Sequence, residues 1–438
     1  MIKISAHIRK FFRKILSSIA FYPSAIALLF LIFSLVMVSI EYKPFLVPLR
    51  EFLDNLLVKG PENARLILGT LMGSLISLMV FSFSMVMVVL SQASSTLSPR
   101  VIPALVGKKY HQVVLGVYLG SIVYCLILIT NIHVTPEKTE IPSLGILIAI
   151  FLGITCLGMF IYFIDSISRS IQVDTIMEEI FNGTRSKMRS VDNQDEEDID
   201  LPEMDGWKVI LTKETGYLKQ IHVPSLKAIA EKESIKIAVV TNPGFFLVKN
   251  YPFIMVDKPV TEDIENKIRT ACTFYAEEHV GDHYLFGFKQ ISEIAVKALS
   301  PGINDPGTAV KAIDLLSILF IDRMNLREKL YETGSDGQPV LYLPEVSLDY
   351  LLYHNIMPIR KYGESDAAVM FNILECLKNL IYADSSQKGY ERVLVRYISD
   401  LRETIVANNF TPLDHEQFNH LIFKINEHLK YSDPIQML

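Results

Sequence analysis

The chain has 438 residues, half of them hydrophobic and 21% charged, with a net charge of −6. Its 21 Gly, 20 Pro and 4 Cys exclude a collagen-like, disordered or disulfide-stapled protein, and the negative charge disfavours a nucleic-acid partner. The charge is uneven, because residues 1–190 hold 17 Lys/Arg and 10 Asp/Glu, whereas residues 191–438 hold 25 and 38. The composition therefore predicts a basic, very apolar half followed by an acidic, ordinary half.

Four stretches without a charged residue are long enough to cross a bilayer, which takes about 20 apolar residues. They predict transmembrane helices at about 19–40, 66–92, 112–132 and 143–165. Buried helices of a soluble protein are the alternative, but four such runs within 165 residues are unusual there. The first run is too long for a signal peptide and lacks a clear cleavage site, so we expect it to be retained. The fold class expected for residues 1–181 is an all-α four-helix membrane bundle.

Basic residues that flank the spans predict the orientation. The N-terminal arm, the loop with Arg100 and Lys108, and the segment after the fourth span are rich in Lys and Arg. The loop between the first two spans counts against this trend, since it holds Lys43, Arg50, Lys59 and Arg65. The balance predicts that both termini lie in the cytoplasm. Four cysteines without paired spacing suit that reducing compartment.

The second span carries a hydroxyl stripe, because its Ser and Thr residues recur at steps of three, four or seven and so share one face. Gly69 and Gly73 form a GxxxG pattern on the same helix. Close packing between helices and a polar conduction path both explain these residues. A pump is disfavoured, because no Asp, Glu, Lys or Arg lies near the middle of a span. The members of the stripe are Thr70, Ser74, Ser77, Ser84, Ser91 and Ser95.

The second half predicts an α+β, mostly helical cytosolic domain. The helix of the fourth span continues to about Phe181, and an acidic linker follows at 182–205. A small α+β subdomain at 206–260 contains a strand at 216–221, a helix at 224–233, and strands at 235–241 and 245–249. The turn Asn242-Pro243-Gly244 predicts that the last two strands form a hairpin. A helical subdomain is expected at 261–438.

The clearest motif is a corner between two helices in the segment Ala298–Ala309. Pro301 and Gly302 end one helix, and Asp305 caps the next with Pro306 in its first position. The corner could present Ser300, Asn304 and Thr308, together with helix N-terminal amides, to an anionic ligand or headgroup. The alternative is a well-capped helix–helix corner with no ligand.

Other motifs are weaker. Ser98-Pro99-Arg100 ends the second span at the membrane interface, where Arg100 could meet lipid phosphate or acidic residues. His279 and His283 are four residues apart, but Gly281 interrupts the helix that would make them a metal site. No phosphate-binding loop and no nucleophile elbow is present in the sequence. We expect no metal, no cofactor and no assignable catalytic residue.

The Ala298–Ala309 segment, with its ALSPGINDP stretch, resembles an uncharacterised bacterial family of predicted multipass membrane proteins, grouped as a domain of unknown function. Ser98-Pro99-Arg100 and Gly216-Tyr217-Leu218 add to the resemblance, which covers about Leu66 to Leu380. It implies an inner-membrane protein with a soluble C-terminal domain and no established activity. One departure is that the family tends to have Gln-Asp before an aromatic–Gly pair, where this chain has Asp282-His283 before Phe286-Gly287.

Our leading functional hypothesis is a channel-like homo-oligomer. In it, the cytosolic domain senses an unknown ligand or partner and controls a hydroxyl-lined path through the bundle. The alternatives are a membrane-anchored sensor or scaffold without transport, and an enzyme that acts at the inner leaflet through the Ser300–Thr308 corner. The lipid bilayer is the one partner that the sequence itself indicates.

Overall fold

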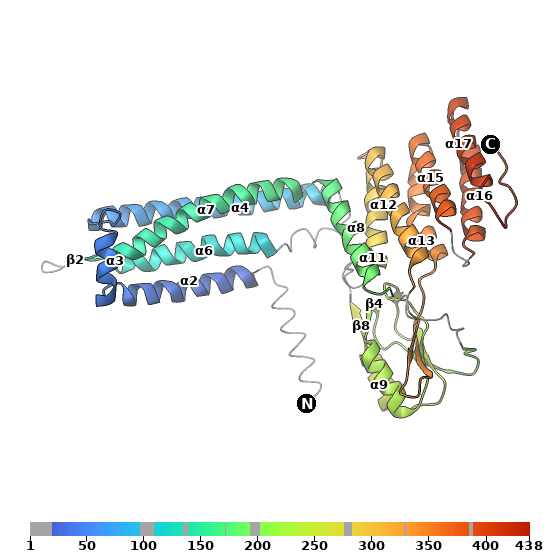
Figure 1. Ribbon diagram of the computed structural model, residues 1–438, viewed down its shortest axis with the longest axis horizontal. Helices are drawn as coiled ribbons and strands as arrows, with labels where there is room; N and C mark the ends of the chain where they lie inside the picture. The colour runs from blue at the N-terminus through green and yellow to red at the C-terminus, as the bar shows by residue number, and fades with distance from the viewer. Residues whose placement is uncertain are drawn as a thin grey trace. The chain divides into compact units, whose positions relative to one another are not determined.

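The computed structural model describes residues 20–96, 109–134, 139–170, 172–192, 202–275, 283–327, 330–384 and 389–438 (Figure 1). The chain divides into two compact units, the first ending at Gln172 and the second continuing from Val173. Four apolar helices lie in the first unit, and a mixed domain of helices and strands forms the second. The expected fold class is therefore confirmed in outline, and a closed bundle stays a prediction.

The first unit contains four helices that are long and apolar enough to cross a membrane, over Phe21–Ile40, Pro61–Gln92, Tyr110–Thr130 and Ser143–Arg169. Four apolar helices therefore occur where the four spans are predicted, and their crossing of a membrane stays a prediction. The second starts at Pro61, earlier than predicted, since Pro suits the first turn of a helix. The elements are α2 (Phe21–Ile40), η1 (Pro44–Leu46), α3 (Val47–Phe52), α4 (Pro61–Thr96), α6 (Lys109–Thr130), β1 (His133–Val134), β2 (Thr139–Glu140) and α7 (Ser143–Ser170).

Side chains from α2, α4, α6 and α7 share buried apolar clusters. One cluster joins Met37 of α2, Leu68 of α4, Tyr124 of α6 and Leu144 of α7. A second gathers residues of α4, α6 and α7, among them Cys156. Burial of apolar side chains of this kind lets the four helices pack as neighbours within one chain.

The strands of the second unit form two small sheets. The five-stranded sheet has the order β3-β7-β5-β10-β9, and the three-stranded sheet has the order β6-β4-β8. The expected hairpin is wrong, because β6 pairs with β4 and β5 pairs with β7 and β10. The strands are β3 (Lys208–Leu211), β4 (Gly216–Ile221), β5 (Ile237–Val239), β6 (Phe246–Leu247), β7 (Pro252–Val256), β8 (Cys272–Tyr275), β9 (Tyr331–Thr333) and β10 (Pro339–Tyr342).

Helices make up most of the second unit. They are α8 (Val173–Arg189), α9 (Val223–Glu233), α10 (Glu262–Thr270), α11 (Leu285–Ala298), α12 (Pro306–Asn325), α13 (Leu348–Asn355), α14 (Met357–Gly363), α15 (Ala367–Ala383), α16 (Glu391–Ala407) and α17 (Pro412–Asn426). Side-chain caps begin several of these helices, and the cap at Asp305 is the one expected above. Asp305 accepts from the amide of Thr308, and Thr411 forms a capping box with Asp414.

The region after the fourth span differs from the expectation. Helix α7 ends at Ser170, and a separate helix, α8, runs from Val173 to Arg189. Residues 182–189, expected in the acidic linker, are therefore helical. The reason is that Ile176, Ile180 and Met188 bury one face of α8. Residues 193–201, the most acidic part of that linker, lie outside the described residues.

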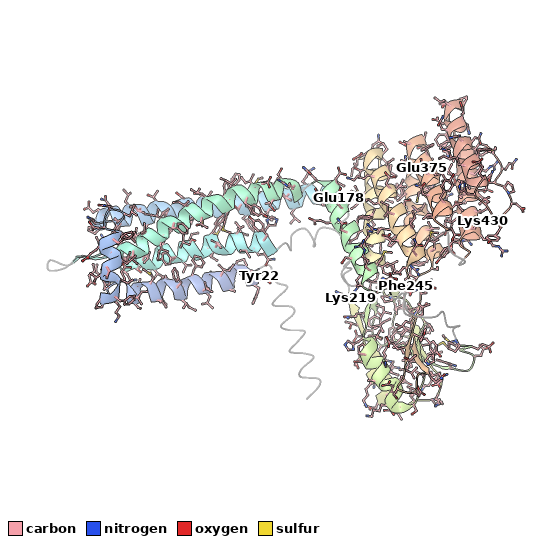
Figure 2. The ribbon with its side chains drawn as sticks, in the orientation of Figure 1. Tyr22, Glu178, Lys219, Phe245, Glu375 and Lys430 are labelled. Atoms are coloured by element: carbon pink, nitrogen blue, oxygen red, sulfur yellow. The ribbon has the colours of Figure 1, made fainter. Side chains whose placement is uncertain are left out.

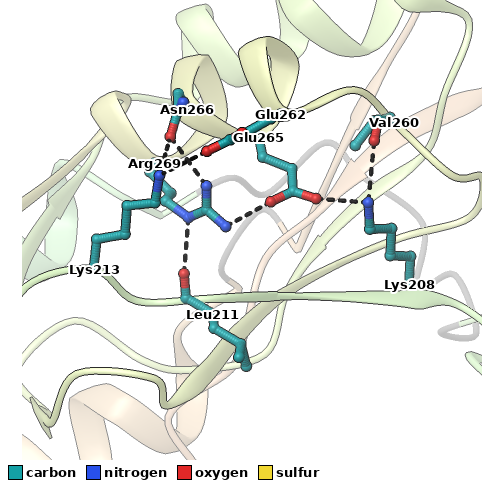
Figure 3. A network of polar contacts seen from close by, with 8 residues as sticks. All are labelled: Lys208, Leu211, Lys213, Val260, Glu262, Glu265, Asn266 and Arg269. Atoms are coloured by element: carbon teal, nitrogen blue, oxygen red, sulfur yellow. Dashed lines mark hydrogen bonds and ion pairs between the residues drawn. The ribbon is translucent and has the colours of Figure 1, made fainter.

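A polar network fastens α10 to β3 (Figure 3). The Glu265 carboxylate accepts from Lys208 Nζ at 2.6 Å and from Arg269 Nη2 at 2.6 Å. Arg269 Nε donates to the carbonyl of Leu211 at 2.8 Å. These bonds, led by the one from Lys208, lower the pKa of Glu265. The network is internally satisfied, which is typical of a structural cluster.

Candidate functional site

The hydroxyl stripe of α4, defined here as Thr70, Ser74, Ser77, Ser84 and Ser91, lies on the outer surface of the chain. All five residues are exposed in the structure. Ser77 donates to the carbonyl of Gly73 at 3.0 Å, and Ser84 donates to the carbonyl of Val80 at 2.9 Å. The side chain of Ser95 lies outside the described residues. The stripe is thus not part of the packing between helices of one chain.

The two glycines beside the stripe also face open space. A β-carbon added at Gly69 or Gly73 would meet no described atom within 4 Å. The close approach of helices occurs elsewhere, at Gly116 and Gly120 of α6. Added β-carbons there would lie 2.8 Å from Ile26 and 2.7 Å from Phe30, both on α2. The sequence signal for this contact is a second GxxxG pattern, at Gly116 and Gly120 of the third span.

Local hydrogen bonds occupy the side chains of Ser300, Asp305 and Thr308 in the Ala298–Ala309 corner. Ser300 Oγ donates to the carbonyl of Lys297 at 2.7 Å, and Thr308 Oγ1 donates to Asp305 Oδ2 at 2.6 Å. The amide of Thr308 donates to Asp305 Oδ1 at 3.1 Å. The bonds from Thr308 lower the pKa of Asp305, so the carboxylate is charged at neutral pH. An anion bound here would have to replace that carboxylate at the helix N-terminus.

The backbone of the corner explains its sequence. Asn304 has a φ of 51°, in the left-handed region that Asn tolerates better than most residues. The amide of Asp305 donates to the carbonyl of Ala298 at 2.9 Å, which closes the turn onto the end of α11. Pro301 is exposed beside it. The structure brings Ser300, Pro301, Asn304, Asp305 and Thr308 together in one loop, and the described contacts account for them as a cap.

Two other expected sites fall wholly or partly on residues that the structure does not describe. Ser98, Pro99 and Arg100 lie outside the described residues, and so does His279. His283 accepts from the amide of Leu285 at 3.1 Å. Within the described ranges, no group of three or more His, Cys, Asp or Glu side chains could hold a metal ion.

Sequence reasoning missed a buried carboxylate at the end of α2. Glu41 is fully buried and accepts from the amides of Leu144 and Gly145, at 3.0 and 3.2 Å, at the start of α7. Arg50 of α3 pairs with Glu41 Oε1 at 3.1 Å. A carboxylate is favourable at a helix N-terminus, and a cation beside it reduces the cost of burial. We call Glu41 and Arg50 the outer clasp, because they join α2, α3 and α7.

Helix α8 is held against the helical part of the second unit by a set of contacts that we call the α8 clamp. Arg185 Nε pairs with Asp322 Oδ2 of α12 at 2.6 Å. Lys311 of α12 pairs with Asp174 at 3.1 Å and reaches Glu178 at 3.7 Å. Figure 2 labels Glu178 on α8. A β-carbon at Gly287 of α11 would lie 1.7 Å from Thr184 Oγ1. The clamp therefore fixes the helix that follows α7 in the chain.

Comparison with known proteins places this architecture in a family. A model described as "Predicted membrane protein (DUF2254)" matches residues 16–379. The chain belongs to this family. Uncharacterized proteins of Mycobacterium bovis and Mycobacterium tuberculosis are each 24% identical over 352 residues, which is 76% of this chain and 67% of theirs. No solved structure matches. The family resemblance inferred from ALSPGINDP is confirmed, and DUF2254 is a family of predicted membrane proteins.

Proposed function

We propose that this DUF2254 member assembles with copies of itself through the α4 stripe, and that its C-terminal unit senses a ligand or partner and controls a hydroxyl-lined path. The observation that carries the proposal is the outward position of the stripe, beside Gly69 and Gly73. In a bilayer this face contacts lipid tails unless another helix covers it. Small and hydroxyl residues are the ones that membrane helices use to approach each other closely.

The outer faces of the other spans support this assignment. Helix α7 exposes Phe151, Ile154, Leu157 and Ile161, which are large apolar side chains suited to lipid. Helix α4 exposes apolar side chains such as Val80 and Val88, but adds hydroxyls at steps of three, four or seven residues. A homo-oligomer would bury that row at a symmetric interface or along a shared axis.

The α8 clamp supplies the route by which the C-terminal unit acts on the spans. Two residues, 171 and 172, separate α7 from α8 in the chain. Since Arg185 and Lys311 fasten α8 to α12, a shift of the α11–α12 pair carries α8 with it. We propose that such a shift changes the path when a ligand or partner binds. Control of this kind requires that α8 has two arrangements. The equilibrium between them must shift both when the ligand or partner binds and when the path changes.

The proposed location is the bacterial inner membrane, with both termini in the cytoplasm. The loop that counts against this orientation contains basic residues with structural partners. Arg50 pairs with Glu41, and Arg65 donates to the carbonyl of Ile132 at 3.3 Å. Because Arg50 and Arg65 have structural partners, packing explains why they lie in this loop. They are therefore weaker evidence against the orientation predicted by the other basic segments that flank the spans.

The experiment is ion flux through liposomes that contain the purified chain. We expect flux of small ions with the unchanged chain and its loss in the double variant Ser77→Leu/Ser84→Leu. The control is Thr155→Leu on α7, because Thr155 is also exposed and donates to the carbonyl four residues earlier, at 2.9 Å. Absence of flux from the unchanged chain at every voltage and ion tested removes the channel-like function.

One observation favours the second candidate, a sensor or scaffold without transport. The hydroxyls of Ser77 and Ser84 are satisfied by their own helix, so they can face lipid or a neighbouring helix without water. In that case the double variant weakens self-association but no flux exists to be lost. The third candidate, an inner-leaflet enzyme at Ser300–Thr308, has less support because Asp305 and Thr308 bond each other.

A further inference from the structure

A pocket of about 640 Å³ lies between α13, α14 and α16 in the C-terminal unit. Its volume falls within the range of small-molecule sites, roughly 300–1,000 Å³. Helix α13 contributes residues at steps of three and four, and α16 contributes a facing set from a distant part of the chain. The lining includes Asp349, Tyr353, His354, Arg360, Arg396 and Asp400.

Aromatic rings form one wall of the pocket. The ring of His354 lies 4.1 Å from that of Tyr350 and 5.3 Å from that of Tyr353, measured between centroids. Phe245, which is labelled in Figure 2, stacks on Tyr350 with 4.9 Å between ring centroids and holds this wall against the sheet subdomain. Burial and the nearby charge of Lys289 lower the pKa of His354, so its ring is neutral at pH 7. Tyr353 remains 60% exposed and offers a free ring face.

The charged residues of the pocket form two internal pairs. At one end, Arg396 pairs with Asp349, which also accepts from the Tyr397 hydroxyl at 2.8 Å. At the other end, Arg360 Nη1 pairs with Asp400 Oδ2 at 2.6 Å and donates to Thr404 at 2.7 Å. The lining therefore has no net charge, and an ionic ligand would have to break one of these pairs. A neutral ring with hydrogen-bonding edges needs no such exchange.

We propose that this pocket binds a small, planar, heteroaromatic molecule of zero net charge, stacked on the exposed ring of Tyr353. The ring of His354 stands nearly perpendicular to that of Tyr353, at 83°, and meets the edge of the ligand. The paired Arg and Asp groups lie at the two ends of the pocket. Stacking on Tyr353 supplies the affinity, and the two pairs select against anions and cations. The proposal rests on the proposed function for its role in sensing, but binding itself is measured without a membrane gradient. Its failure is therefore distinguishable from a failure of flux.

The experiment measures binding of three probes to the full chain in detergent micelles by equilibrium dialysis. The probes are adenine (neutral and heteroaromatic), benzoate (an anion) and benzyltrimethylammonium (a cation), with protein-free micelles as the blank. We expect adenine to have the lowest Kd of the three. Tyr353→Ala should raise that Kd about tenfold, the effect of losing one stacking partner. Tyr362→Ala is the matched control, since Tyr362 lies on α14 outside the pocket and is 55% exposed.

A second variant tests the charge balance. Arg396→Gln leaves Asp349 without its cation, and Arg396 is exposed, so the fold should be kept. We expect benzyltrimethylammonium to gain affinity by about tenfold or more in this variant, while benzoate does not. The proposal is overturned if adenine shows no saturable binding, if a charged probe binds the unchanged chain more tightly, or if Tyr353→Ala and Tyr362→Ala have the same effect.

Discussion

Gly287 of α11 and Thr184 of α8 approach so closely that a β-carbon at Gly287 would lie 1.7 Å from Thr184 Oγ1 and 2.8 Å from its Cβ. This contact gives a physical reason for the glycine in the Phe286-Gly287 pair, which the sequence singles out next to Asp282-His283. Thr184 is buried, and its hydroxyl donates to the carbonyl of Ile180 at 2.6 Å. Its side chain is therefore fixed and cannot move away from a β-carbon at Gly287. The crossing of α8 and α11 depends on the missing side chain.

Gly287→Ala should therefore destabilise the chain, by about 1–3 kcal/mol, the usual cost of overpacking. The measurement is thermal unfolding in detergent micelles. Gly302→Ala serves as the control, because a β-carbon there meets no described atom within 4 Å. Adding Thr184→Ala to Gly287→Ala should restore part of the loss, since it removes the nearest atom but keeps the Cβ. Equal unfolding temperatures for Gly287→Ala and Gly302→Ala would contradict the close crossing.

The lowered pKa of Glu265 predicts that the free energy of unfolding depends on pH. Its pKa is lowered by the bonds from Lys208 and Arg269, so the folded state holds this carboxylate charged more readily than the unfolded state does. The resulting stability is present above the unfolded pKa, near 4.5, and is lost as the pH falls through the folded pKa. Glu265→Gln should lower the free energy of unfolding at pH 7 by about 1 kcal/mol and have less effect in acid. Glu262→Gln is the control, because the Glu262 side chain is 81% exposed. A loss for Glu265→Gln that is the same at pH 7 and at pH 3 would refute this linkage.

Variants of Asp305 can distinguish a helix cap from a ligand site. If its role is to cap α12, Asp305→Asn should keep most of the stability, because Asn caps as well as Asp, and Asp305→Ala should cost about 1 kcal/mol. Chemical unfolding of the two variants at pH 7 measures the difference. If Asp305→Asn keeps the stability but abolishes the ion flux of the chain, the corner has a function beyond capping.

The outer clasp should contribute strongly to the first unit. Glu41→Gln removes the negative charge that binds Arg50 and the N-terminal amides of α7. We expect the free energy of unfolding to fall by an amount on the order of 2 kcal/mol. Asp54→Asn is the control, since the pair of Asp54 and Lys59 is exposed at both ends and should contribute less than about 1 kcal/mol. Unfolding in detergent micelles measures both. A Glu41→Gln variant as stable as Asp54→Asn would show that the clasp adds nothing.

Local patterns predict the parts of this molecule that depend on neighbours in sequence. The four spans, the cap at Asp305 and the capping box at Thr411 all follow from residues within a few positions of each other. Features that join distant segments could not be read in this way. Strand β6 pairs with β4 rather than with β5, and the pair of Arg396 and Asp349 joins helices 47 residues apart. The outer clasp was hidden for the same reason, because Glu41 meets the amide of Leu144 across 103 residues.

Self-association through the α4 stripe is tested most directly by the mass of the assembly in lipid nanodiscs, measured for the unchanged chain and for Ser77→Leu/Ser84→Leu. We predict that the unchanged chain forms an oligomer, that Thr155→Leu leaves it intact, and that the double variant shifts it toward monomers. An unchanged chain that is monomeric at every protein-to-lipid ratio, or a double variant with the same mass as the unchanged chain, would contradict the role given to the α4 stripe.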